Sequence, residues 1–187
     1  MEKVIERLRN NTRKSAFNRQ GYQVTFEVGS FHRALRFYSE SINEHTENGD
    51  LISQMVPEFQ RDNDKWSLER KIKFVENILC GFQSTIMLAT INNDLMDDCF
   101  ILDGLQRLTA LQDWFDGKFP VYGDIWYKDL SHLRRAPFVD CRMSLVIHRF
   151  SSMQECVNFY IDINKGISHS EEDIKRATDY LEKLGKG

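Results

Sequence analysis

The segment Ile101–Leu111, ILDGLQRLTAL, constrains the fold of this chain more than any other segment. Its first residues are apolar without alternation, which is typical of a strand covered on both faces. Gly104 provides the backbone freedom that a tight corner needs. Apolar residues from Leu108 to Phe115 then follow at helical spacing. The pattern predicts a buried strand that turns directly into a helix after Asp103.

The same corner brings three polar side chains to the start of the predicted helix: Asp103, Gln106 and Arg107. A helix N-terminus with a fixed cation beside it favours an anion, and phosphate is the usual occupant. The carboxylate can hold a metal-bound water, a sugar hydroxyl or the arginine itself. Two interpretations follow: a phosphate site, or an Asp103–Arg107 pair that only holds the corner together.

Length and composition are those of one globular domain. The chain has 187 residues, of which 41% are apolar, which is enough for a substantial core. Its net charge of −3 gives no general attraction to nucleic acid or to anionic membranes. The four cysteines are scattered and are expected to be reduced thiols. Because no signal peptide or membrane-spanning apolar run is recognised, we expect a cytoplasmic protein.

Residues 1–20 form a basic arm whose only acidic residues are two glutamates. One interpretation is a solvated helix or a frayed terminus. The other is an arm that lies on a nucleic-acid backbone and binds it with an affinity that depends on salt. In that case the DNA-binding residues are Arg7, Arg9, Arg13 and Lys14.

Residues 21–187 read as one domain in which strands and helices are mixed without repeated strand–helix–strand units. Apolar runs predict strands at 22–28, 51–56, 85–91, 99–103, 121–127 and 141–150. Apolar stripes and capping residues predict helices at 31–48, 68–79, 105–115, 153–164 and 171–184, with Ser30 and Ser67 as caps, and a helical turn at 130–136. These elements predict an α+β domain with a small mixed sheet packed against helices.

Three segments resemble one known family. Asp103–Thr109, DGLQRLT, is similar to the DGQQRLT motif of ParB/sulfiredoxin-like domains at the N-terminus of GmrSD-type and SspE-type restriction proteins. Phe59–Arg61 followed by Trp66 resembles an upstream P-x-F-Q-R…W element. Residues 163–171, INKGISHSE, resemble the downstream I-N-x-G-x-x-L-S-x-x-E stretch. The resemblance spans residues 31–180, in the order of the family.

The resemblance implies a ParB/sulfiredoxin-like fold that binds a nucleoside triphosphate with Mg²⁺ and hydrolyses it slowly, gating attached DNA-cutting modules. No nuclease module is recognised, so a stand-alone copy is expected. Leu105 stands where the family motif has a glutamine, and nucleotide binding is therefore better supported than hydrolysis. The five histidines form no recognisable metal-binding or nuclease grouping.

On this interpretation Asp103, Gln106 and Arg107 are catalytic. Arg107 forks onto phosphate oxygens, and Arg61 approaches from the facing loop. Gln106 and Gln60 orient oxygens or a water, while Asp103 orients the arginine or binds Mg²⁺ through water. The nucleotide-binding residues are Gly104, Arg107, Gln60, Arg61, Asn164 and Lys165.

Two other classes of function stay open. A non-catalytic binding module would bind a restriction complex or DNA, as a regulator or an anti-defence protein. A small DNA-nicking endonuclease would need acidic residues grouped around two metal ions, and the sequence shows no such grouping. Analogy of fold does not by itself separate these classes.

Overall fold

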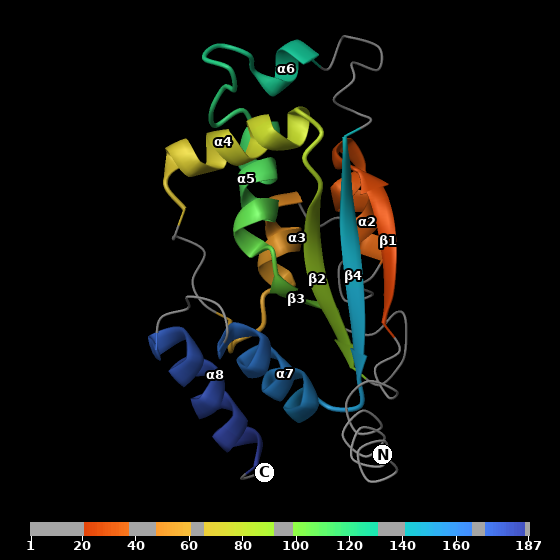
Figure 1. Ribbon diagram of the computed structural model, residues 1–187, viewed down its shortest axis with the longest axis vertical. Coiled ribbons are helices and arrows are strands. Elements are labelled where there is room, and N and C mark those ends of the chain that lie inside the picture. The colour runs from red at the N-terminus through yellow and green to blue at the C-terminus, as the bar shows by residue number, and fades with distance from the viewer. Residues whose placement is uncertain are drawn as a thin grey trace, which may run out of the picture.

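A four-stranded mixed sheet organises the domain (Figure 1). The computed structural model describes residues 21–37, 48–60, 66–91, 99–130, 141–165 and 171–185. The strands are β1 (Tyr22–Glu27), β2 (Ser84–Ile91), β3 (Cys99–Asp103) and β4 (Arg142–Phe150). The helices are the 3₁₀ turn η1 (Val28–Ser30), α2 (Phe31–Phe37), α3 (Asn48–Gln54), α4 (Leu68–Leu79), α5 (Leu105–Phe115), α6 (Tyr127–Leu130), α7 (Met153–Lys165) and α8 (Glu171–Leu184). The predicted α+β class is confirmed.

The strand order is β1-β4-β2-β3. β4 runs parallel to β2 and antiparallel to β1, while β2 and β3, the strands predicted at 85–91 and 99–103, form an antiparallel hairpin. β3 is therefore an edge strand, and its Ile101 N–H donates to the carbonyl of Met55 at 2.8 Å. This hydrogen bond places β3 beside the segment that follows α3.

Hydrophobic side chains cover both faces of the sheet. Ile86, Leu88 and Ile101 pack in one core with side chains of α2 to α5. Ala89 and Leu102 pack in a second core with side chains of α7 and α8. Successive strand residues point to opposite faces, so Ile101 and Leu102 enter different cores. The uninterrupted apolar run in β3 reflects burial on both faces, as predicted.

Two of the predicted helix starts are confirmed by their capping contacts. Ser67 Oγ accepts the N–H of Arg70 at 3.3 Å at the start of α4. Ser152 Oγ accepts the N–H of Glu155 at 3.2 Å at the start of α7. Ser30, predicted to be a cap, lies inside the η1 turn instead. Outside the described residues lie 38–47, where the end of the first helix is predicted, and 131–136, where most of a helical turn is predicted.

The strand predicted at 51–56 is wrong. This segment belongs largely to α3, so Asn48 begins a helix where the sequence predicted the end of one. Leu51, Ile52 and Met55 are all buried, and their i, i+1, i+4 spacing places them on one face of a helix. A short apolar run fits either element, and here packing against α5 decides for a helix.

The strand predicted at 121–127 is also wrong. Tyr122 and Gly123 have φ values of +49° and +92°, which a strand does not accommodate. Val121 and Ile125 form an isolated bridge instead. None of the helices in the described ranges is long and apolar enough to cross a membrane.

Asp113 on α5 holds a charge cluster between α4 and the segment after α5. Its carboxylate oxygens lie 2.6 Å from Lys71 Nζ and 2.7 Å from Lys118 Nζ, and the residue is buried. Burial raises the pKa of Asp113, but the hydrogen bonds from Lys118 and Lys71 outweigh burial and hold the pKa below its ordinary value. The ionised carboxylate therefore stabilises the fold.

We expect Asp113→Asn to lower the free energy of unfolding at pH 7 by about 1.5–3 kcal/mol, the contribution of charge-assisted hydrogen bonds. Because the folded pKa is depressed, this contribution is complete above the ordinary aspartate pKa and is lost as the pH falls through the folded pKa. Urea titrations at pH 7 and at about pH 3 should therefore show the two proteins converging in acid. Asp124→Asn, at an exposed loop position, is the control. If the difference in free energy of unfolding between wild type and Asp113→Asn does not change with pH, the ionised carboxylate is not its source.

Candidate functional site

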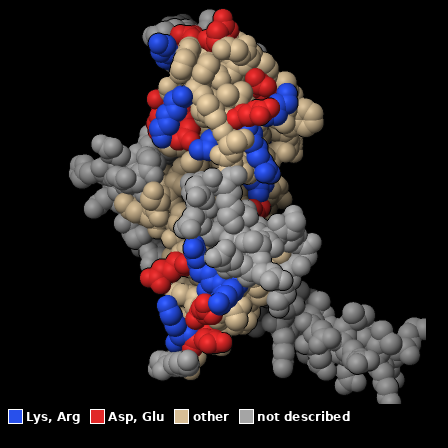
Figure 2. Space-filling view, turned by 90° about the vertical axis from the view of Figure 1, so that its left-hand side faces the viewer, with Lys and Arg blue, Asp and Glu red and all other residues tan. Residues whose placement is uncertain are grey.

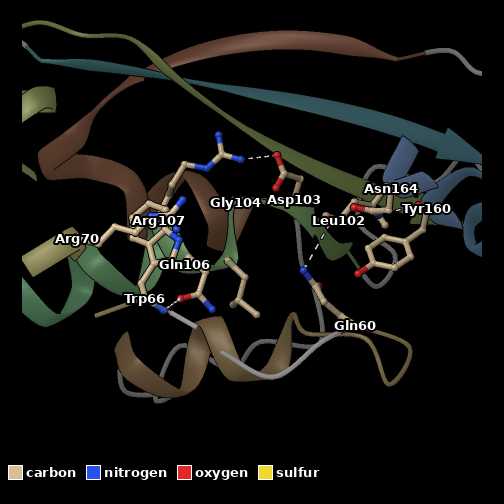
Figure 3. Close-up of a pocket in the computed structure, with 11 residues that line it drawn as sticks. Gln60, Trp66, Arg70, Leu102, Asp103, Gly104, Gln106, Arg107, Tyr160 and Asn164 are labelled. Atoms are coloured by element: carbon tan, nitrogen blue, oxygen red, sulfur yellow. Dashed lines mark hydrogen bonds and ion pairs between the residues drawn. The ribbon is translucent and has the colours of Figure 1, made fainter. Parts of the chain in front are cut away.

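A pocket of about 320 Å³ lies at the corner between β3 and α5 (Figure 3). Its lining comes from segments far apart in the sequence. These residues are Gln60; Trp66 and Arg70; Leu102, Asp103, Gly104, Leu105, Gln106 and Arg107; and Tyr160 and Asn164. Figure 3 shows the two arginines and Trp66 toward one end, and Tyr160 and Asn164 toward the other. The predicted corner is therefore one wall of a site that the tertiary structure completes.

Gly104 makes the corner possible. Its φ is +101°, in the left-handed region that residues with a Cβ rarely adopt. A Cβ at this position would lie 2.4 Å from Cδ1 of Ile86 and 3.3 Å from its Cα. The chain passes directly over β2 and enters α5 at the next residue, which confirms the predicted strand-to-helix corner.

Arg107 is held by groups of the sheet. Its Nη2 donates to Oδ2 of Asp103 in an ion pair, and its Nη1 donates to the carbonyl of Thr85 at 2.6 Å. The arginine side chain is 24% exposed and that of Asp103 46%, so both still reach the pocket. A guanidinium has five N–H donors, and the contacts of Arg107 with described residues do not use all of them. The pair holds the corner and remains able to contact a phosphate.

A second guanidinium, that of Arg70, lies at the same end of the pocket. Arg70 is exposed on the first turn of α4, and its Cζ lies 4.8 Å from the centre of the Trp66 ring, within cation–π distance. α4 and α5 both line the pocket with their N-terminal turns, which carry partial positive charge. Two helix N-termini and two arginines together favour an anion here.

Two buried amides form part of the wall. Gln60 is 6% exposed and Gln106 is 5% exposed. Nε2 of Gln60 donates to the carbonyl of Leu102 at 3.5 Å, and Oε1 of Gln106 accepts the N–H of Trp66 at 3.1 Å. The other amide atoms, Gln60 Oε1 and Gln106 Nε2, have no hydrogen-bond partner among the described residues.

The opposite end is formed by α7, with support from α8. Asn164 Nδ2 donates to the carbonyl of Tyr160 at 2.6 Å, so this amide is turned back onto its own helix. Tyr160 packs edge-on against Phe59, with 5.2 Å between ring centres. Arg176 of α8 donates to the carbonyl of Gln60 at 3.0 Å. The C-terminal helices therefore position Gln60.

Leu105 presents an apolar side chain at the pocket wall and packs into the larger core. Within the described ranges, no group of three or more His, Cys, Asp or Glu residues could hold a metal ion. Among the described residues that line the pocket, Asp103 is the one with a carboxylate. Since Mg²⁺ commonly takes one or two carboxylates together with substrate phosphates, these residues fit Mg²⁺ bound with a triphosphate better than a metal ion bound alone.

The chain matches the family model of the GmrSD restriction endonuclease N-terminal domain over residues 38–185. It belongs to this family. A search of curated proteins and a search of solved structures each gave no match. The matched range includes every residue that lines the pocket. The whole candidate site therefore lies within the GmrSD N-terminal domain, a family of restriction systems.

Within this GmrSD N-terminal domain, the structure brings together most of the predicted site residues. Those that line the pocket are Gln60, Asp103, Gly104, Gln106, Arg107 and Asn164. Arg61 lies outside the described residues, and Lys165 is described only as the last residue of α7. The predicted DNA-binding residues Arg7, Arg9, Arg13 and Lys14 also lie outside them.

Trp66, Arg70, Leu102 and Tyr160 line the pocket but are not among the predicted site residues. Arg70 had a usable signal, because it follows Trp66 at i+4 on the first turn of a capped helix, where the two side chains can stack. Tyr160 had none, because it reads as a core position of an amphipathic helix. Only packing shows that it closes a pocket.

Acidic and basic side chains of the described residues are interspersed on the face shown in Figure 2. A nucleic-acid-binding surface is typically a basic patch or stripe. The charge pattern of this part of the surface therefore does not support a broad DNA-binding face, and DNA binding by the arm at 1–20 stays a prediction.

Proposed function

We propose that this GmrSD N-terminal domain binds a nucleoside triphosphate and acts in DNA restriction or in its regulation. The observation that carries the proposal is the anion-attracting end of the pocket, where the first turns of α4 and α5 meet Arg70 and Arg107. Phosphate groups are the anions that such helix ends commonly bind. The volume of about 320 Å³ lies within the range of small-ligand pockets, and the family supports the restriction context.

In the proposed complex the triphosphate lies against the two guanidinium groups. Arg107 is already oriented by Asp103 and Thr85, so its remaining donors can contact phosphate oxygens without reorganisation. Arg70 neutralises further charge from the facing helix. Bound Mg²⁺ would neutralise charge on the phosphates, with Asp103 holding it directly or through water. The predicted roles of these residues are thus mutually compatible.

Hydrolysis is the second part of the proposal. Phosphoryl transfer depends on positioning and charge neutralisation more than on covalent chemistry, and the unpaired Nε2 of Gln106 can orient an oxygen or an attacking water. Leu105, however, places an apolar side chain in the pocket wall where the family motif has an amide. We therefore expect nucleotide binding to be readily measured and hydrolysis to be slow.

Purified protein with Mg²⁺ should bind at least one of ATP, GTP, CTP and UTP saturably in titration calorimetry, and EDTA should weaken that binding. Phosphate release measured in parallel tests hydrolysis. Binding without release would favour the second candidate, a non-catalytic regulator, which the apolar Leu105 supports. If none of the four nucleotides binds or is hydrolysed, the proposal fails.

A further inference from the structure

We propose that the pocket orients its nucleotide with the base at Gln60, whose Oε1 accepts a hydrogen bond from a base N–H and so determines base preference. The inference rests on the proposed nucleotide binding. It adds the direction of the ligand in the pocket and the residue that distinguishes one base from another. Two buried amide atoms of opposite hydrogen-bonding character carry it.

The orientation of each amide is set by a backbone group. The carbonyl of Leu102 can only accept, so the Gln60 atom that faces it at 3.5 Å is Nε2. The N–H of Trp66 can only donate, so the Gln106 atom that faces it at 3.1 Å is Oε1. Exchanging O and N in either amide would bring two acceptors or two donors together. The unpartnered atom of Gln60 is therefore its amide oxygen, and that of Gln106 is its NH₂ group.

Neither atom has a hydrogen-bond partner among the described residues. Both residues are more than nine-tenths buried, and Arg176 donates a hydrogen bond to the backbone carbonyl of Gln60 at 3.0 Å. Buried polar atoms in native proteins are almost always hydrogen-bonded. Because both residues line the pocket, a ligand with one donor and one acceptor at matching positions would satisfy the two atoms.

The opposite character of the two atoms sets the direction of the ligand. Gln106 lies on the first turn of α5 beside Arg107, so its NH₂ group adds a donor to the anion-attracting end. Gln60 Oε1 is an acceptor and would repel phosphate oxygens. Figure 3 shows Gln60 on the Tyr160 side of the pocket, away from Trp66. A nucleotide meets both requirements, since its phosphates offer oxygens and its base offers N–H groups.

The test compares the four nucleoside triphosphates and inorganic tripolyphosphate, each with Mg²⁺, by calorimetry on wild type and Gln60→Met. We expect wild type to bind its preferred nucleotide at least about tenfold more tightly than tripolyphosphate and than the least favoured nucleotide. Gln60→Met keeps the length of the side chain and removes the acceptor. Gln60→Met should weaken binding of the preferred nucleotide about tenfold and reduce the differences in affinity among the four nucleotides. Its affinity for tripolyphosphate should change less than about twofold.

Gln112→Met is the matched control. Gln112 is also 5% exposed on α5 and also has an unpartnered Oε1, but it does not line the pocket. Equal effects of the two variants, or loss of tripolyphosphate binding in Gln60→Met, would overturn the role of Gln60. So would equal binding of all four nucleotides by wild type, a result that needs no variant to fold. If wild type binds neither nucleotides nor tripolyphosphate, the proposed function itself fails.

Discussion

Arg107→Ala is expected to lower the stability of the domain and to weaken nucleotide binding strongly. The guanidinium donates to the Thr85 carbonyl of β2 at 2.6 Å and pairs with Asp103 at the end of β3. A hydrogen bond from a charged group contributes about 1.5–3 kcal/mol, whereas the half-exposed Asp103 adds little because solvent screens it. We expect a loss of about 2 kcal/mol in the free energy of unfolding, seen as a fall in Tm of about 4–8 °C.

The effect on binding should exceed the effect on stability. Arg107 is oriented before any ligand arrives, so its loss removes a preorganised phosphate contact. We expect at least about a hundredfold weaker binding of the preferred nucleotide, which corresponds to roughly 3 kcal/mol. Arg107→Lys keeps the positive charge but loses the planar, bidentate donors of the guanidinium. Its nucleotide affinity should therefore lie between those of wild type and Arg107→Ala.

Arg142→Ala is the control, because Arg142 is exposed at the start of β4 and does not line the pocket. Calorimetry and thermal unfolding together separate the two roles of Arg107. If Arg107→Ala lowers Tm but binds nucleotide like wild type, the arginine only holds the corner. If Tm is unchanged while binding is lost, the contacts with Asp103 and Thr85 do not stabilise the fold.

Gly104→Ala is expected to be the most destabilising of the small substitutions in this domain. An alanine at φ +101° is strained, and its Cβ would lie 2.4 Å from Ile86 Cδ1 in the core. The left-handed backbone costs about 1–2 kcal/mol, and overpacking a core adds about 1–3 kcal/mol. We expect the free energy of unfolding to fall by roughly 2–5 kcal/mol in urea titrations, with weaker nucleotide binding because the corner shifts.

Gly117→Ala is the matched control for this substitution. Gly117 also has a positive φ, +70°, but nothing lies within 4 Å of the Cβ that an alanine would add. The fall in the free energy of unfolding of Gly117→Ala should therefore come from backbone strain alone, about 1–2 kcal/mol. Adding Ile86→Val to Gly104→Ala removes the clashing methyl group and should restore part of the stability. Equal losses at Gly104 and Gly117 would show that the contact with Ile86 does not matter.

The corner at Gly104 was predictable because the information that specifies it is local. An apolar run, a glycine and a helical spacing act on neighbouring residues, and they predicted both the end of β3 and the start of α5. The segments 51–56 and 121–127 were predicted wrongly because a short apolar run has no period of its own. Burial against α5 made the first a helix, and positive φ values at Tyr122 and Gly123 made the second a loop.

The sequence by itself determined the α+β class, the family and the polar residues of the corner, since these depend on residue types at short spacing. Only the tertiary structure decided what those residues contact. Arg107 contacts Thr85, which is 22 residues away, and Gln106 contacts the backbone of Trp66, which is 40 residues away. Gln60 is positioned by α8 through Arg176. Such contacts depend on how the whole sheet packs against its helices, and no local pattern specifies them.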